Sequence, residues 1–151
     1  MESRMASWSA PTALSWLALV RIWLGVIWAW QGLEMFWTGE YRDLTKKLAR
    51  MAAPNPHPRY AAFLARFVLP RARRISPAVA AGELTVGLAL VFGALDGAAA
   101  AAGIVLNVNY YLAASQNFPC NRPLNFLMIG LQAILIAGGA GRSLSVASML
   151  P

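Results

Sequence analysis

Four strongly polar residues interrupt apolar stretches of the sequence: Arg21, Glu83, Asn107 and Gln132. A carboxyl group such as that of Glu83 can exchange a proton or a hydrogen bond with a ligand, and the guanidinium of Arg21 can stabilise negative charge. The two amides can each donate and accept hydrogen bonds. Because polar side chains in apolar helices are costly to expose to lipid, we expect all four to face the interior.

On a helical wheel of about 100° per residue, each of these groups shares a face with small or apolar residues. Three uses fit this pattern: hydrogen bonds that hold helices in register, a polar pocket for a head group such as a quinone ring, and passage of protons or ions. In the pocket, Glu83 and Arg21 would act on the ligand. The residues expected to contact it are Asn107, Gln132, Tyr111 and Trp28. The predicted inward faces are Arg21, Gly25, Trp28, Gly32 and Met35; Glu83, Gly87, Leu90 and Ala94; Ala100, Gly103, Asn107, Tyr111 and Ala114; and Asn125, Ile129, Gln132, Ile136 and Gly139.

The predicted depths of Arg21 and Glu83 differ by roughly 10 Å along the membrane normal, at about 1.5 Å per helical residue. A direct pair between them would need both side chains extended. A second polar cluster, which includes Gln31 and Glu34 among the aromatic residues Trp30, Trp37 and Tyr41, lies at the end of the first apolar stretch. It fits either an interfacial aromatic belt with a solvated carboxylate or the entrance of a ligand site, with Glu34 as a second functional carboxylate.

The elements that carry these residues are four apolar windows at about 14–37, 77–95, 98–114 and 124–139. Hydrophobic residues make up 58% of the chain and charged residues only 13%, and the mean hydropathy is +0.51. About 20 residues of helix cross a bilayer core, and the windows lack the polar outer face of a soluble bundle. The sequence therefore predicts an all-α fold, a single membrane domain over 1–151 built as a four-helix transmembrane bundle. The first window exceeds the core of a secretory signal, so we expect it to be retained.

Basic residues concentrate between the first and second windows, in the segment 38–76. This segment holds nine of the thirteen lysines and arginines, so the positive-inside rule places it in the cytoplasm and both termini on the opposite side. Apolar residues recur there with helical spacing, at Leu44, Leu48 and Met51 and then at Tyr60, Phe63, Leu64 and Phe67, beside basic residues. The pattern predicts two amphipathic interfacial helices that contact anionic lipid rather than nucleic acid. Pro77 is expected in the first turn of the second transmembrane helix. Asp96-Gly97 is expected to form the turn that follows this helix.

Cysteine and histidine usage limits redox chemistry within the chain. The single cysteine, Cys120, excludes an internal disulfide and a CxxC pair, and the single histidine, His57, excludes a bis-histidine haem. No haem, iron–sulfur or metal site is expected. Any redox centre must therefore come from a ligand or a partner.

The order of several short motifs resembles that of DoxX-type membrane proteins, including the DoxD subunit of thiosulfate:quinone oxidoreductases. The motifs are Arg21-x-x-x-Gly25 with Trp28 and Gln31-Gly32-Leu33-Glu34, then Gly82-Glu83-x-x-x-Gly87, Asn107-x-Asn109-Tyr110 and Gly138-Gly139-Ala140-Gly141-Arg142.

The resemblance implies a quinone-associated subunit of a bacterial or archaeal cytoplasmic membrane, with thiosulfate or another sulfur compound oxidised by a partner oxidoreductase subunit. It also points to Arg21, Glu83 and Asn107 as the first residues to test. The alternative is a non-catalytic scaffold or assembly subunit whose basic loop recruits a partner or anionic lipid. The chain is expected to assemble with a partner subunit or as a homo-oligomer. Whether the chain is itself an enzyme stays open.

Overall fold

The computed structural model describes residues 13–52, 55–114 and 121–139, and every regular element among them is helical. The predicted all-α fold is therefore confirmed. Each predicted apolar window lies within or close to one of four long helices. The elements are α1 (Ala13–Thr38), η1 (Glu40–Arg42), α2 (Thr45–Ala52), α3 (Pro58–Phe63), η2 (Leu64–Val68), η3 (Leu69–Arg71), α4 (Ala72–Phe92), α5 (Asp96–Ala114) and α6 (Asn121–Gly138).

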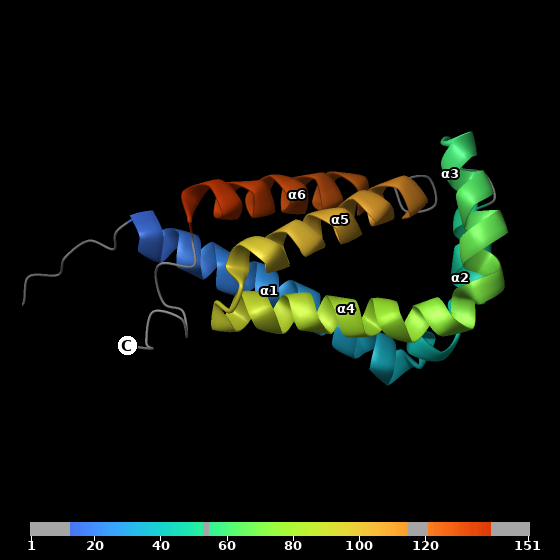
Figure 1. The fold of residues 1–151 in the computed structure, drawn as a ribbon, viewed down its shortest axis with the longest axis horizontal. Coiled ribbons are helices and arrows are strands. Elements are labelled where there is room, and N and C mark those ends of the chain that lie inside the picture. Colours follow the sequence, from blue (N-terminus) through green and yellow to red (C-terminus); the bar gives the residue numbers. More distant parts are fainter. Residues whose placement is uncertain (1–12, 53–54, 115–120, 140–151) are drawn as a thin grey trace, which may run out of the picture.

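The long helices pack as two pairs, α1 with α4 and α5 with α6 (Figure 1). Glycines bring α1 and α4 close together, because a Cβ at Gly87 would lie 2.3 Å from the backbone nitrogen of Ala29. About one helical turn further along this contact, a Cβ at Gly32 would lie 2.7 Å from the nitrogen of Leu84. Helices that approach this closely need small residues at the contact. The two pairs lie together at the end where α4 turns into α5 and separate toward the end where α2 and α3 lie (Figure 1).

The helical segment from α3 to α4 is continuous but sharply bent. It runs from Pro58 to Phe92 and turns at η3, which contains Pro70 (Figure 1). Proline removes a backbone donor and clashes with the preceding turn, which explains the bend. The prediction that Pro77 begins the second helix was wrong: α4 begins at Ala72 and carries Pro77 in its interior. The helix begins early because its first turn continues the helical segment that comes before it.

The turn between α4 and α5 also differs from the prediction. Positive φ angles occur at Gly93 (69°) and Leu95 (55°), and the N–H of Ala94 donates to the carbonyl of Ala89 at 2.9 Å. The chain therefore turns over 93–95, and Asp96, predicted as part of the turn, instead opens α5. An acidic residue in a first turn complements the helix dipole. Cys120 lies outside the described residues.

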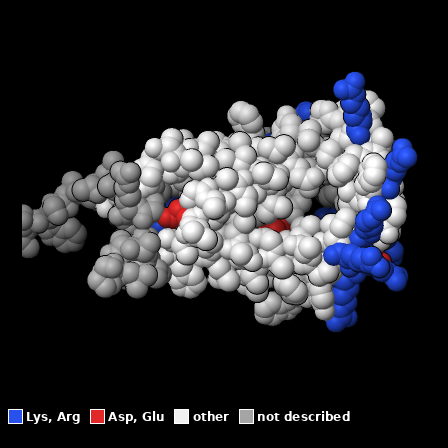
Figure 2. Space-filling view, viewed as in Figure 1, with Lys and Arg blue, Asp and Glu red and all other residues white. Residues whose placement is uncertain are grey.

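The outer surface of the long helices is apolar. Large exposed side chains occur on each of them, with Trp23 67% exposed, Val105 68% and Phe126 72%. Two helical segments, Ser15–Thr38 and Pro58–Phe92, are long and apolar enough to cross a membrane, and α6 is apolar but shorter. Lysines and arginines gather at the end formed by α2, α3 and the bend, while the middle of the visible face is almost free of charge (Figure 2).

The predicted inward faces agree with burial at their polar positions. Arg21 and Gln132 are fully buried, Asn107 is 1% exposed and Glu83 3%. The wheel was wrong at two apolar positions, since Ala94 lies beyond α4 and is exposed, and Ile136 is 45% exposed. Met128 and Leu135 are buried in α6 instead, so its inward face is rotated by a fraction of a turn from the predicted one.

Hydrogen bonds fasten the segment between α1 and α4 to the bundle. The N–H of Leu44 donates to Oγ of Ser76 in α4 at 3.0 Å. Nδ2 of Asn55 donates to the carbonyl of Leu112 in α5 at 2.9 Å, and the Tyr60 hydroxyl donates to Asn109. Leu64 is buried here with Met51 and Ala113. The short helices α2 and α3 thus cover the open end between the two helix pairs.

Candidate functional site

A cavity of about 670 Å³ occupies the space between the separated ends of the two helix pairs. Its walls come from all four long helices and from the covering segment, and the volume lies within the range usual for small-molecule sites. The lining residues are Gln31, Glu34, Met35, Thr38, Glu40, Leu44, Lys47, Leu48, Met51, Tyr60, Phe63, Leu64, Val68, Ile75, Val79, Glu83, Asn109, Tyr110, Ala113, Leu124 and Asn125. Most are apolar, so the cavity suits a ligand with few polar atoms.

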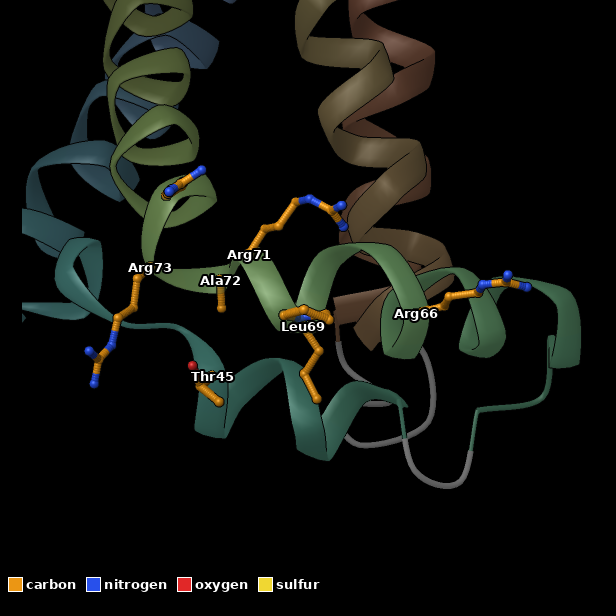
Figure 3. Close-up of a pocket in the computed structure, with 8 residues that line it drawn as sticks. Thr45, Arg66, Leu69, Arg71, Ala72 and Arg73 are labelled. Atoms are coloured by element: carbon orange, nitrogen blue, oxygen red, sulfur yellow. The ribbon is translucent and has the colours of Figure 1, made fainter.

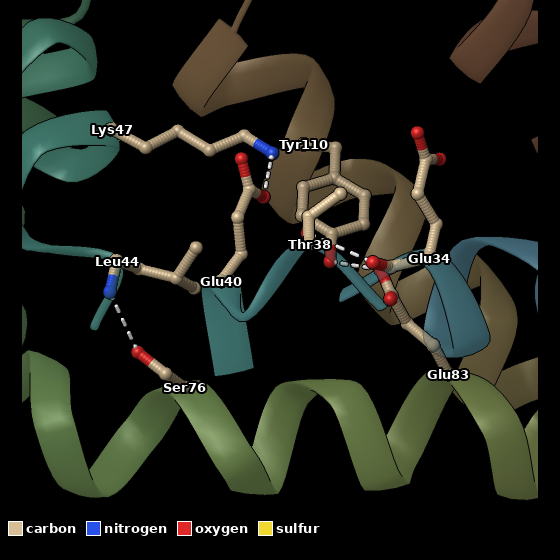
Figure 4. Close-up of polar contacts among 8 residues, drawn as sticks. All are labelled: Glu34, Thr38, Glu40, Leu44, Lys47, Ser76, Glu83 and Tyr110. Carbon is tan, nitrogen blue, oxygen red and sulfur yellow. Dashed lines mark hydrogen bonds and ion pairs between the residues drawn. The ribbon is translucent and has the colours of Figure 1, made fainter. Parts of the chain in front are cut away.

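The Glu83 carboxyl is the most deeply buried ionisable group of the cavity, at 3% exposed. Its Oε1 accepts a hydrogen bond from the hydroxyl of Tyr110, which reaches across from α5 (Figure 4). Among the described residues, its Oε2 has no hydrogen-bond partner. A buried polar atom without a partner is costly. The cavity therefore offers a fixed carboxyl oxygen to a ligand.

Other polar groups of the cavity come from α1, η1 and α2. Nζ of Lys47 lies 2.8 Å from Oε2 of Glu40, and both side chains are about four-tenths exposed. This ion pair spans the space between η1 and α2 (Figure 4). Glu34 also lines the cavity, but its carboxylate points away from that of Glu83 (Figure 4). Of the predicted second cluster, Gln31 and Glu34 thus border the cavity.

The aromatic members of that cluster lie elsewhere. Trp30 and Trp37 are exposed on the outer surface, at 69% and 90%. The ring of Tyr41 packs against Phe36 with centroids 4.9 Å apart. Outward-facing tryptophans beside a basic end are typical of an interfacial belt.

Arg21 lies apart from the cavity, at the opposite end of the bundle. Its Nη1 is 3.2 Å from Oδ2 of Asp96, and the Arg21 side chain is fully buried. The large difference in depth predicted between Arg21 and Glu83 agrees with this separation. The sequence did not predict the partner, because Asp96 was read as a turn residue rather than as the start of α5.

The two interior amides pair with each other. Nδ2 of Asn107 donates to Oε1 of Gln132 at 3.1 Å, which links α5 to α6. A Cβ at Gly103 would lie only 2.2 Å from Nε2 of Gln132, so the glycine makes room for the amide. Trp28 is fully buried and stacks on Tyr110, with ring centroids 6.4 Å apart. Asn107, Gln132 and Trp28 do not line the cavity, but Trp28 contacts Tyr110, which lines it and bonds to Glu83.

Tyr111, a predicted ligand contact, does not line the cavity, whereas its neighbour Tyr110 does. The guanidinium of Arg122 lies 5.1 Å from the centre of the Tyr111 ring, outside the cavity. Tyr110 follows Asn107 by three residues, and both i+3 and i+4 lie on the same side of a helix. The spacing from Gly103 and Asn107 was therefore compatible with Tyr110 as well as with Tyr111.

A second hollow, of about 670 Å³, lies on the basic surface at the bend. Four arginines line it, and four other residues complete its wall. The arginines are Arg66, Arg71, Arg73 and Arg74, and the others are Thr45, Leu69, Pro70 and Ala72. Arg66 and Arg73 point in opposite directions (Figure 3). Nε of Arg73 lies 3.7 Å from Oδ2 of Asp43. Diverging cations make a positively charged surface rather than a pocket shaped for one anion.

The described residues contain no group of three or more His, Cys, Asp or Glu side chains that could hold a metal ion. The apolar cavity with its buried carboxyl fits a quinone ring, which needs a flat apolar space and one or two hydrogen-bonding groups at its oxygens.

Comparison with protein-family models, with curated proteins and with solved structures finds no match to this chain.

Proposed function

We propose that this chain is a membrane subunit that binds a quinone in the cavity at Glu83 and works with a partner oxidoreductase, as its resemblance to DoxX-type proteins implies. The observation that carries the proposal is the buried Oε2 of Glu83, which has no hydrogen-bond partner within the described part of the chain, in a residue that lines a mostly apolar cavity. A quinone exchanges two electrons and two protons when it is reduced to the quinol. The partner supplies the electrons, from thiosulfate or another reduced sulfur compound.

The proposal places four helices across the bilayer. The apolar outer surface of α1, α4, α5 and α6 supports this placement, because lipid is the solvent that such a surface requires. The basic end then lies in the cytoplasm and the α4–α5 turn on the opposite side. In this orientation α2, α3 and η2 lie along the headgroups, with half-exposed Phe63 and Phe67 toward the acyl chains.

Within the cavity, Glu83 performs the polar chemistry. In its protonated form Oε2 can donate a hydrogen bond to a quinone carbonyl, and in its ionised form it can accept one from a quinol hydroxyl. Tyr110 holds the carboxyl in place through Oε1. Arg21 is neutralised by Asp96 at the far end of the bundle, so it stabilises the fold in this proposal and does not contact the ring.

Binding of a short-chain radiolabelled quinone to the purified protein tests the proposal. Glu83→Leu keeps a similar side-chain volume but removes both oxygens, and we expect at least tenfold weaker binding. Glu34→Leu, at the border of the same cavity, is the matched control and should change affinity less than about twofold. Wild-type protein that fails to bind, or Glu83→Leu protein that binds as wild type does, would contradict the proposal.

A second candidate is a scaffold that recruits a partner or anionic lipid through the basic end, and the four arginines at the bend favour it. It predicts that replacing Arg71, Arg73 and Arg74 by glutamine breaks a complex isolated from native membranes, whereas Glu83→Gln leaves it intact. The opposite result favours the quinone subunit. Mass spectrometry of the two isolated complexes, for subunits and retained lipids, distinguishes the candidates.

A further inference from the structure

The cavity contains an apolar strip that leads away from Glu83 along α4. Val79 and Ile75 precede Glu83 by four and eight residues, so all three lie on one face of the helix. At about 1.5 Å per residue, Ile75 lies about 12 Å from Glu83. Leu64, Val68 and Phe63 continue the strip beyond the bend. A ring bound at Glu83 would fill only one end of this space.

Polar groups lie on a different wall of the cavity from this strip. Gln31 and Glu34 belong to α1, Glu40 belongs to η1, and its partner Lys47 belongs to α2. The Lys47–Glu40 ion pair satisfies its own charges. The residues of the strip, on α4, α3 and η2, are all apolar, so the strip suits a hydrocarbon chain.

The strip also reaches the outside of the bundle. Phe63, at its far end, is 47% exposed. A hollow is visible on the face formed by α4 and α5, beside the basic end (Figure 2). Beside Glu83, the α1–α4 side is closed by the glycine contacts. The end is covered by α2 and α3, and Leu44 before α2 and Asn55 before α3 are hydrogen-bonded to α4 and α5. A chain lying on the strip can thus leave toward lipid between α4 and α5.

We propose that the occupant of the cavity is a long-chain quinone whose apolar tail lies along Val79 and Ile75 and leaves the bundle near Phe63. This inference rests on the proposed function and adds the tail to it. Because lipid is as apolar as the strip, the tail gains little free energy from burial there. The strip therefore determines where the tail lies more than how tightly the molecule binds, and position is the quantity to measure.

A quinone with a photoreactive group on its tail, about 12 Å from the ring, tests the inference in nanodiscs. We expect cross-links in the segment 63–79 that excess unlabelled long-chain quinone suppresses. Val79→Trp should lower their yield at least fivefold by filling the strip. Val105→Trp makes the same change on the outer surface of α5, where Val105 is 68% exposed, and should leave the yield unchanged.

Binding of a tail-less quinone, measured in parallel, separates failure of this inference from failure of the function. If the tail-less quinone binds and requires Glu83, but the cross-links fall on outer lipid-facing residues or persist in Val79→Trp, the tail site is wrong and the ring site stands. If Val79→Trp abolishes tail-less binding as well, the strip is not separate from the ring site, and the inference is wrong. Absence of tail-less binding overturns both.

Discussion

The hydroxyl of Tyr110 in α5 donates a hydrogen bond to Oε1 of Glu83 in α4, and this bond joins the two helix pairs beside the cavity. It holds one carboxyl oxygen and leaves the other for a ligand. The position of the carboxyl therefore depends on a residue of another helix.

Tyr110→Phe tests that dependence, with Tyr111→Phe as a control one residue away. Removing the Tyr110 hydroxyl leaves Glu83 without its positioning bond, and we expect about fivefold to tenfold weaker quinone binding, equivalent to about 1 kcal/mol. Tyr111 contacts Arg122 through its ring, so its phenylalanine variant should bind as wild type does. Equal losses in the two variants would contradict the assignment.

Gly87→Ala should destabilise the contact between α1 and α4. The added methyl would lie 2.3 Å from the nitrogen of Ala29, and overpacking of this kind costs about 1–3 kcal/mol. Gly82→Ala, in the same helix, meets nothing within 4 Å and should be neutral or stabilising by up to about 1 kcal/mol. Thermal unfolding in detergent compares the two, and a Gly87→Ala protein as stable as Gly82→Ala protein would refute the close contact.

Asp96→Asn should destabilise the protein without affecting quinone binding. It removes the charge that faces the fully buried Arg21, and loss of one partner of a buried pair costs about 3 kcal/mol. Glu40→Gln breaks a half-exposed ion pair and should cost less than about 1 kcal/mol. Both the unfolding midpoint and the quinone affinity are measured for each variant. Comparable midpoints for the two variants, or weaker quinone binding by Asp96→Asn protein, would contradict a purely structural role for Arg21.

The free energy of unfolding should fall at low pH, and protonation of Asp43 should contribute to this loss. Its Oδ1 accepts hydrogen bonds from the N–H and the hydroxyl of Thr45 at the start of α2. These bonds hold the pKa of Asp43 below its ordinary value of 3.8. A lowered pKa in the folded state means that the contribution is complete above pH 3.8 and is lost as pH falls through the folded value.

Wild-type protein should accordingly be more stable than Asp43→Asn protein at pH 6, and the difference should narrow below about pH 4. Thermal unfolding at a series of pH values measures this difference. A difference that stays constant down to pH 2 would assign the effect to some other group.

The proposed orientation predicts opposite labelling of the two ends of the bundle. In a Cys120→Ser background, an impermeant maleimide should modify Lys46→Cys from the cytoplasmic side only. Leu95, 82% exposed in the α4–α5 turn, should react as Leu95→Cys from the other side only. Labelling of both variants from one side would refute the proposed placement across the bilayer.

The inward burial of Arg21, Glu83, Asn107 and Gln132 could be predicted because helical period and the cost of exposing polar groups act within one helix. Their partners could not be predicted in the same way. The bond from Tyr110 to Glu83 depends on how α5 is rotated against α4, and the pair of Arg21 with Asp96 depends on where α5 begins. Both are set by packing between helices.

The walls of the cavity were not predicted either, although a pocket at Glu83 was one expectation. Gln31 and Glu34 stood out as polar groups at a helix end. The cover formed by α2 and α3 arises from the bend at Pro70, and a proline among basic residues reads equally well as a loop. The start of α4 at Ala72 was missed for the same reason, since Pro77 was assigned to the helix start.

The glycine contacts between α1 and α4 have a geometric consequence for the cavity. They pack α1 and α4 into one unit, α5 and α6 form a second unit, and the turn over 93–95 connects the two. α5 extends about 28 Å from this turn, at about 1.5 Å per residue. A rotation of about 2° there would move the far end of α5 by about 1 Å. The width of the cavity is therefore sensitive to small changes in the backbone angles of the turn, although the turn lies at the opposite end of the bundle.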